Sequence, residues 1–180
     1  ENYNAHPYQN LPVIKKYTNG SALENMKWGI TPSWSKKKEF KPLINARLET
    51  IDEKISFKNL IKLTRCVVVA DGFYEWKHNE NSKIPYYFLR EDKKLMFMAG
   101  IYEEDQFCII TEEAISNVSE IHQRQPVLLD EKNVNRYLNI ELNGSVFLRE
   151  CKKPNLNFYK VSKEVNRPTN NSFFLIQKVK

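Results

Sequence analysis

The stretch of sequence that decides the fold is Cys66-Val67-Val68-Val69-Ala70-Asp71-Gly72-Phe73-Tyr74-Glu75-Trp76. Its first five residues are apolar and mostly β-branched, and no polar residue alternates with them. This pattern is typical of a strand that is buried on both faces. Asp71-Gly72 favours a tight turn, and the four residues that follow alternate in the manner of a strand. The stretch therefore predicts a central buried strand, a turn, and a second strand that carries the acidic side chain of Glu75.

Short strand-like runs dominate the rest of the chain, and helices are few. We expect further strands over residues 86–89, 95–102, 107–111, 126–129 and 173–179. One helix is expected to follow the capping box of Thr50 and Glu53 and to bury a face from Ile55 to Ile61. Two more are expected over residues 114–121 and 130–138, the second with Asp130 as its N-cap. Exposed loops are expected at residues 79–82 and 139–144, and an irregular return along the sheet over residues 154–168.

Strands joined mostly by short loops, with clustered helices, indicate an α+β fold. We expect a mainly antiparallel β-sheet or open-barrel core with a few peripheral helices. The chain has 180 residues, of which 41% are hydrophobic and 28% charged. That length suffices for one domain with a substantial core and is too short for two domains of ordinary size. The prediction is therefore a single domain over residues 1–180.

The start of the chain and its hydropathy bear on location. No apolar run approaches the roughly 20 residues that cross a bilayer. The start, Glu1-Asn2-Tyr3-Asn4, lacks the basic head and the apolar stretch of a secretory signal. We therefore expect a cytoplasmic protein with no membrane partner. Because the chain begins with Glu rather than Met, we also expect a longer natural chain.

The cysteines and the net charge indicate which bonds and partners to expect. Cys66, Cys108 and Cys151 are odd in number and show no CxxC spacing, which argues against a disulfide framework and against a bound metal. Cys66 and Cys108 are predicted to be buried thiols. The net charge of +6 fits a polyanionic partner, although many lysines merely face solvent, and we interpret Lys36-Lys37-Lys38 as a solvated loop.

Two tryptophans flank a Gly and a Pro in Trp28-Gly29-Ile30-Thr31-Pro32-Ser33-Trp34. This composition excludes a regular helix, so we expect a loop to display at least one indole ring. A displayed ring near basic residues can stack on unpaired bases. The alternative for either Trp is an anchor in the core.

Polar side chains are concentrated in Asn45-Ala46-Arg47-Leu48-Glu49-Thr50. Asn45 can orient a substrate group, and the guanidinium of Arg47 can hold a phosphate with two parallel hydrogen bonds. The alternative is a surface ion pair between Arg47 and Glu49.

Glu75 lies between two aromatic residues, directly after the buried strand. If its side chain shares the face of Phe73, its carboxyl group lies among aromatic rings. Desolvation there raises the pKa of a carboxyl group and suits general acid/base work. If it faces outward, Glu75 is a solvated residue of a strand.

A titratable side chain occurs in Ile121-His122-Gln123-Arg124-Gln125-Pro126. In an extended segment His122 and Arg124 share one side. An imidazole next to a guanidinium suits chemistry on a sugar-phosphate backbone. The alternative is that His122, like most single histidines, is structural or solvated.

Taken together and in this order, these motifs closely resemble the SRAP (SOS response-associated peptidase) family. Asn4-Ala5-His6-Pro7-Tyr8-Gln9 near the start, and Val161-Ser162 followed by Val165-Asn166 near the end, also fit the family pattern. The resemblance runs from about Asn2 to Leu175, nearly the whole chain. Its most specific part is Asp71-Gly72-Phe73-Tyr74-Glu75-Trp76.

The resemblance implies that the protein binds single-stranded DNA, or single-stranded/double-stranded junctions, and recognises an abasic deoxyribose. It implies no cofactor, and we expect a monomer that associates with nucleoid DNA during the DNA damage response. Family members attack the aldehyde of the opened sugar with an N-terminal Cys, whose α-amine forms a Schiff base before its thiol closes a thiazolidine. An α-amine with a pKa of about 8 is substantially neutral, and so nucleophilic, at cellular pH.

The family's residue roles carry over onto matching positions of this chain. Glu75 and His122 are implied as the acid/base pair, with His122 promoting opening of the sugar ring and Glu75 shuttling protons. Asn45 is implied to orient the sugar or the nucleophile. Arg47 and Arg124 are implied to hold the flanking phosphates, while Pro7 and Trp28 line the DNA groove.

The chain departs from the family pattern at its start, because residues 1–180 do not contain the N-terminal segment with the nucleophilic Cys. None of the three internal cysteines has a free α-amine to replace it. His6 stands where Ala is common and adds a titratable group near the groove, and Gln125 stands where Met is common. Three other functions stay open: a single-stranded DNA-binding module without chemistry, a peptidase that only processes itself, and an RNA-binding domain.

Overall fold

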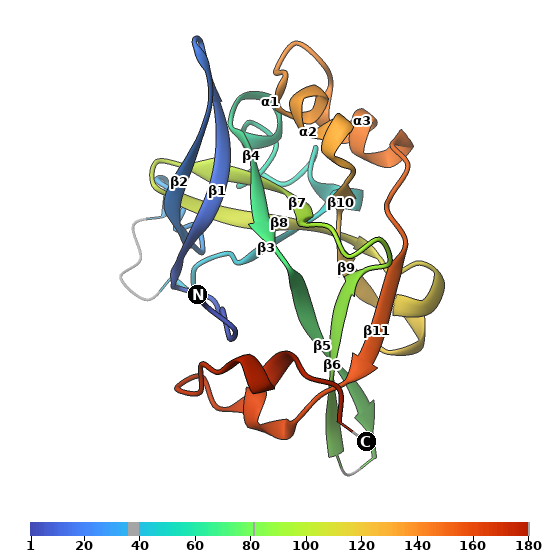
Figure 1. Ribbon diagram of the computed structural model, residues 1–180. Coiled ribbons are helices and arrows are strands. Elements are labelled where there is room, and N and C mark those ends of the chain that lie inside the picture. The colour runs from blue at the N-terminus through green and yellow to red at the C-terminus, as the bar shows by residue number, and fades with distance from the viewer. Residues whose placement is uncertain (36–39, 81, 180) are drawn as a thin grey trace.

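A computed structural model describes residues 1–35, 40–80 and 82–179 and arranges their strands in two sheets (Figure 1). The predicted loop at Lys36-Lys37-Lys38 lies outside the described residues. The larger sheet has eight strands: β1 (Asn10–Tyr17), β2 (Gly20–Trp28), β3 (Asn45–Arg47), β4 (Arg65–Ala70), β7 (Met96–Glu103), β8 (Gln106–Glu113), β9 (Arg124–Pro126) and β10 (Leu128–Leu129). The smaller sheet has three: β5 (Gly72–Asn79), β6 (Ser82–Arg90) and β11 (Leu156–Lys160).

The larger sheet closes into a barrel. Its strand order is β10-β7-β4-β1-β2-β8-β3, and β9 pairs with β8. An additional pairing of β7 with β8 closes β7, β4, β1, β2 and β8 into a ring. The short pairings of β2 and β3 with β8 are parallel, and the other pairings are antiparallel. The predicted α+β class with a mainly antiparallel core is therefore confirmed, while the barrel is closed by the β7–β8 pairing rather than open.

The deciding stretch links the two sheets. β4 is a central strand, because β1 and β7 pair with it on either side, as predicted. The predicted turn at Asp71-Gly72 is wrong: Gly72 opens β5, which leaves the barrel and pairs with β6. Glycine is required here because a Cβ atom would lie 2.2 Å from the carbonyl oxygen of Phe88 and 2.5 Å from the ring of Tyr87.

The helices are shorter than predicted. α2 (Glu131–Leu138) confirms the third predicted helix, although the Asp130 carboxylate accepts a hydrogen bond from Arg90 rather than capping the helix. The helix expected after Thr50 is replaced by a 3-10 turn, η1 (Leu48–Thr50), and by α1 (Leu60–Leu63). Ile55 is 73% exposed, so the predicted apolar face is not buried as a continuous stripe.

Three more segments differ from the prediction. Residues 114–121 contain a 3-10 helix, η2 (Ser116–Glu120). α3 (Gly144–Glu150) follows the predicted loop and was not predicted. The strand predicted over residues 173–179 is wrong, because that segment contains a 3-10 helix, η4 (Phe173–Ile176), that docks through side chains: Leu175 is buried in a cluster with Tyr87.

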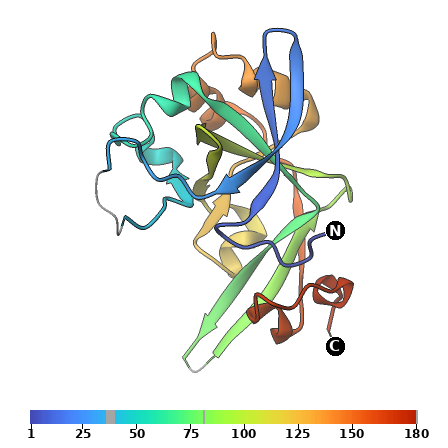
Figure 2. The same ribbon diagram turned by 90° about the vertical axis from the view of Figure 1, so that its left-hand side faces the viewer.

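Three apolar clusters hold these layers together. The first lies between the barrel and α1–α3, and the second between the barrel and the small sheet. The third joins the small sheet to the C-terminal segment, which also contains η3 (Lys163–Asn166). Both ribbon views show the β5–β6 hairpin extending away from the barrel, with the C-terminal segment beside it (Figures 1 and 2).

The three cysteines are free thiols, and Cys66 and Cys108 are buried, as predicted. Among the helices of the described residues, none is long and apolar enough to span a membrane.

Candidate active site

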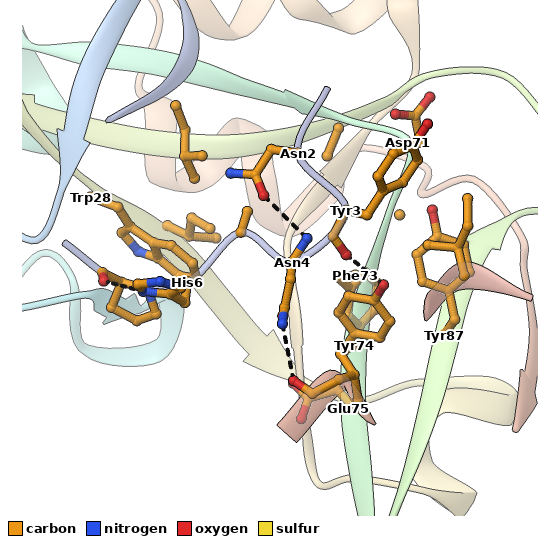
Figure 3. Close-up of a pocket in the computed structure, with 18 of the residues that line it drawn as sticks. Asn2, Tyr3, Asn4, His6, Trp28, Asp71, Phe73, Tyr74, Glu75 and Tyr87 are labelled. Atoms are coloured by element: carbon orange, nitrogen blue, oxygen red, sulfur yellow. Dashed lines mark hydrogen bonds between the residues drawn. The ribbon is translucent and has the colours of Figure 1, made fainter. Parts of the chain in front are cut away.

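A cavity of about 1010 Å³ opens where the first residues of the chain, the β4–β5 link and the C-terminal segment meet. Its lining includes Pro7, Trp28, Glu75 and His122, which are four of the seven site residues expected from the sequence. Figure 3 shows side chains from the N-terminal segment and from β5 pointing into the same space. The fold therefore gathers at one place motifs that are far apart in the chain.

The wall made by the N-terminal segment is anchored by Asn4. This side chain is buried, and its amide nitrogen donates to the main-chain carbonyl groups of Val165, Arg167 and Asn170 at 3.0–3.2 Å. The hydroxyl of Tyr74 donates to the carbonyl of Tyr3 at 2.7 Å (Figure 3). These bonds fix the start of the chain onto both β5 and the C-terminal segment, so the cavity has a defined shape.

Glu75 faces the cavity rather than solvent. Side chains alternate along β5, so Glu75 shares the side of Phe73, which packs on the barrel, while Tyr74 and Trp76 pack toward the C-terminal segment. The side chain of Glu75 is 23% exposed, and burial raises its pKa to about 7, against the opposing attraction of His122. The alternative of a solvated strand residue is therefore wrong.

His122 completes a carboxyl–imidazole pair. Its Nδ1 atom lies 3.5 Å from the Oε2 atom of Glu75 and 2.9 Å from the carbonyl oxygen of Arg124. The main-chain nitrogen of Arg124 lies 3.2 Å from the same ring atom, so the carboxyl group of Glu75 and the main chain of Arg124 together hold the imidazole in place. The pair thus combines a carboxyl group that titrates near neutrality with an imidazole.

Trp28 is anchored in the core and also lines the cavity. It ends β2, its indole nitrogen donates to the carbonyl of Ile44 at 2.8 Å, and its ring stacks on Phe107 with an interplanar angle of 11°. The half-buried ring also lines the cavity, together with Pro7 and His6. Gln9 holds the imidazole of His6 through a contact of 2.9 Å between their side-chain nitrogens. An anchored ring keeps its position when a ligand enters.

Asn45, Arg47 and Arg124 lie outside the cavity lining, on strands beside it. β3 carries exposed Asn45 and Arg47 and pairs with β8, and β9 carries Arg124 and pairs with the same strand. Arg47 is in register with Thr111, whose carbonyl oxygen accepts a hydrogen bond of 2.8 Å from Arg124. The two guanidinium-bearing residues are therefore neighbours across β8.

Glu49 also lies on this surface, and its ion-pair partner differs from the one considered from the sequence. Its carboxylate accepts two hydrogen bonds from Arg124, at 2.8 and 2.9 Å, rather than pairing with Arg47. This pairing with Arg124 lowers the pKa of Glu49 to about 2. The guanidinium of Arg124 is thus engaged, and a phosphate that binds it has to compete with Glu49.

Among the described residues, no cluster of three or more His, Cys, Asp or Glu side chains has the geometry to hold a metal ion. What the cavity offers is a carboxyl–imidazole pair among aromatic rings, beside a surface that carries two arginines.

A closed barrel with a small second sheet, and a carboxyl–imidazole pair in an aromatic cavity between them, define an α+β protein with one candidate active site. The chain belongs to the family described as SOS response associated peptidase (SRAP), whose family model matches residues 1–168. The resemblance seen in the motifs is therefore confirmed.

Relatives with assigned names are abasic site processing proteins. One, YoqW of Bacillus subtilis (strain 168), is 34% identical over 190 residues, which cover 97% of this chain and 85% of the relative. Another, YedK of Escherichia coli (strain K12), is 30% identical over 190 residues, which cover 98% of this chain and 84% of the relative. The fold also matches a solved structure of a Bacteroides thetaiotaomicron protein with a TM-score of 0.79 at 25% identity. The superposed region covers 96% of this chain and 82% of the chain in that structure.

Proposed function

We propose that this protein recognises abasic sites in single-stranded DNA, including single-stranded/double-stranded junctions, and captures them through an N-terminal Cys as a covalent thiazolidine that protects the lesion. The observation that carries the proposal is the pair of Glu75 and His122, with 3.5 Å between Oε2 and Nδ1, in an aromatic cavity. The names of the relatives supply the substrate class.

The pair has two tasks in this reaction. The sugar at an abasic site is mostly a closed ring, and its opening to the aldehyde needs a proton removed from the C1′ hydroxyl and one delivered to the ring oxygen. His122 promotes this step by proton transfer through its imidazole. Glu75, whose pKa of about 7 allows it to give or take a proton at cellular pH, shuttles protons during Schiff-base formation and reversal.

The covalent steps balance with the loss of one water. The α-amine of the N-terminal Cys adds to the C1′ aldehyde, the resulting carbinolamine loses water, and an imine forms. The thiol sulfur then adds to the imine carbon while its proton passes to the nitrogen, which closes the thiazolidine. The protein thus acts as a lyase-like enzyme, with self-processing peptidase activity restricted to exposing this Cys.

The surface beside the cavity positions the strand. Arg47 and Arg124 hold the flanking phosphates, Asn45 orients the sugar or the nucleophile, and Trp28 and Pro7 contact the bases that flank the lesion. An abasic position has no base to unstack, so its nucleotide turns into the cavity at a lower cost than an intact one. The protein works as a monomer on DNA in the cytoplasm, in association with the nucleoid.

The second candidate is a single-stranded DNA-binding module without catalysis. It is favoured by the exposed Arg47 on a surface beside an aromatic cavity, because such a surface can hold a strand with no covalent step. Binding then uses the same cavity and arginines, and no bond forms.

Covalent capture is tested with the full natural protein and an abasic oligonucleotide, analysed by denaturing electrophoresis without borohydride. We expect a crosslinked species that forms more slowly with His122→Ala and with altered formation or reversal in Glu75→Gln. Exchange of the N-terminal Cys for Ala should abolish it. If the protein binds abasic DNA but never crosslinks, the binding-module function stands in its place.

A further inference from the structure

Two phenylalanines are displayed on the C-terminal segment. Phe174 is 72% exposed and Phe173 is 53% exposed, although both are among the largest apolar side chains of the chain. η4 carries them, and its neighbouring residue Leu175 is buried. The buried Leu175, together with a hydrogen bond of 2.7 Å from the Tyr159 hydroxyl to the carbonyl of Ile176, anchors this short helix and so holds the two rings toward solvent.

This pair of rings is continuous with the cavity. Phe173 meets the ring of Tyr3 edge to face, with 5.8 Å between centroids, and Tyr3 lines the cavity. The side-chain oxygen of Asn171 accepts a hydrogen bond of 2.7 Å from the main-chain nitrogen of Tyr3. The aromatic surface therefore runs from the cavity lining across Tyr3 to Phe173, and Phe174 follows Phe173 in the same short helix.

The charge around the rings favours a polyanion. Residues 160–179 carry four basic side chains against one acidic side chain, Glu164; the basic ones are Lys160, Lys163, Arg167 and Lys178. All four are exposed. An acidic partner is attracted to such a segment, and flat exposed rings beside basic groups are the features with which proteins hold unpaired bases.

We propose that Phe173 and Phe174 form a stacking site for an unpaired base of the same DNA strand whose abasic sugar enters the cavity. This inference rests on the proposed function and extends it: the strand leaves the cavity over Tyr3, and the base that follows stacks on the exposed ring of Phe174. The site reads no sequence, because every base has a flat face. It lengthens the bound stretch of single strand and favours lesions that have an unpaired neighbour on that side.

The test compares the full protein with its Phe174→Ala variant in binding to fluorescent single strands that contain one abasic site. Three strands are used: one with bases on both sides of the site, one whose 5′ bases are replaced by abasic spacers, and one whose 3′ bases are replaced. We expect Phe174→Ala to weaken binding of the first strand by about 5- to 150-fold, the range for loss of one base–aromatic stack. With one of the two spacer strands the loss should vanish, because the base that stacks is already missing.

Two further variants separate stacking from other effects. Phe174→Leu keeps an apolar side chain without a flat ring and should retain only part of the affinity. Leu23→Ala removes an equally exposed apolar side chain from β2, away from the cavity, and should bind as the wild type does.

The outcomes distinguish this inference from the proposed function. Suppose that the wild type binds and crosslinks abasic DNA, and that Phe174→Ala binds each of the three strands as tightly as the wild type does. The stacking site is then contradicted and the proposed function stands. A uniform loss on all three strands also contradicts the stacking site, because stacking depends on the base. If the wild type binds no single-stranded DNA, both fail.

Discussion

At the scale of single residues, the account depends on the carboxyl group of Glu75. Its position after the buried strand could be predicted from the local pattern, and so could its aromatic neighbours. Its partner could not, because His122 is brought near only by the pairing of β9 with β8 and by the departure of β5 from the barrel. A local pattern contains no information about such long-range contacts.

Replacing Glu75 with Gln should change the pH dependence of stability. A carboxyl group whose pKa is raised by folding, here to about 7, contributes stability below its unfolded pKa of about 4.3, and this contribution is lost as the pH rises through 7. Gln does not ionise. The free energy of unfolding of Glu75→Gln should therefore rise relative to that of the wild type between pH 5 and pH 8, by up to about 3 kcal/mol. Urea denaturation at several pH values measures this gain. A constant difference between the two proteins would show that Glu75 titrates like an ordinary carboxyl group.

The pairing of Glu49 with Arg124 leads to a second prediction. If Arg124 binds phosphate, removing its competitor should strengthen DNA binding. Glu49→Gln should raise the affinity for single-stranded DNA by about 5-fold at most, the worth of a partly exposed ion pair. Glu24→Gln is the matched control, because it removes the same charge from an ion pair with Lys15, 3.3 Å long, on the β1–β2 hairpin. An equal gain in both variants would mean that net charge, and not release of Arg124, is responsible.

At the scale of elements, the sequence predicts the strand that is buried on both faces and misses strands that are largely exposed. β4 was predictable because β1 and β7 cover its edges and apolar layers cover its faces. β1 and β2 were missed because most of β2 is exposed, so its residues show no clear apolar alternation. β5 was predicted, but its change of sheet was not: only the fold reveals that Gly72 lies against the main chain of β6.

Gly72→Ala should therefore destabilise the protein. The added methyl group would lie 2.2 Å from the carbonyl oxygen of Phe88, so β5 has to move away from β6. We expect a loss of about 1–3 kcal/mol in the free energy of unfolding, typical of overpacking, with weaker abasic-site processing because β5 carries Glu75. Denaturation compared with Asp71→Ala, an exposed neighbour, measures the effect. Equal stability of the two variants would contradict the close packing at Gly72.

At the scale of the whole molecule, a net charge of +6 and a surface with Arg47 and Arg124 beside an aromatic cavity fit a single strand of DNA. Binding should weaken with salt, with a log–log slope of about −0.7 for each phosphate contact. Arg47→Ala should lower the affinity and make the slope shallower by about 0.7. Lys132→Ala removes an equal charge from the exposed side of α2 and should leave the slope nearly unchanged. If the Arg47 variant has the wild-type slope, Arg47 contacts no phosphate.

The central claim is that the cavity of Glu75 and His122 recognises the lesion itself. The indole N–H signals of the three tryptophans test it most directly, because Trp28 and Trp76 line this cavity and Trp34 does not. Protein with ¹⁵N-labelled indoles is titrated with two single strands of equal length, one intact and one with a central abasic site. The account predicts that at saturation the Trp28 and Trp76 signals differ between the two complexes, while the Trp34 signal is the same in both. Identical Trp28 and Trp76 signals with the two strands would contradict it.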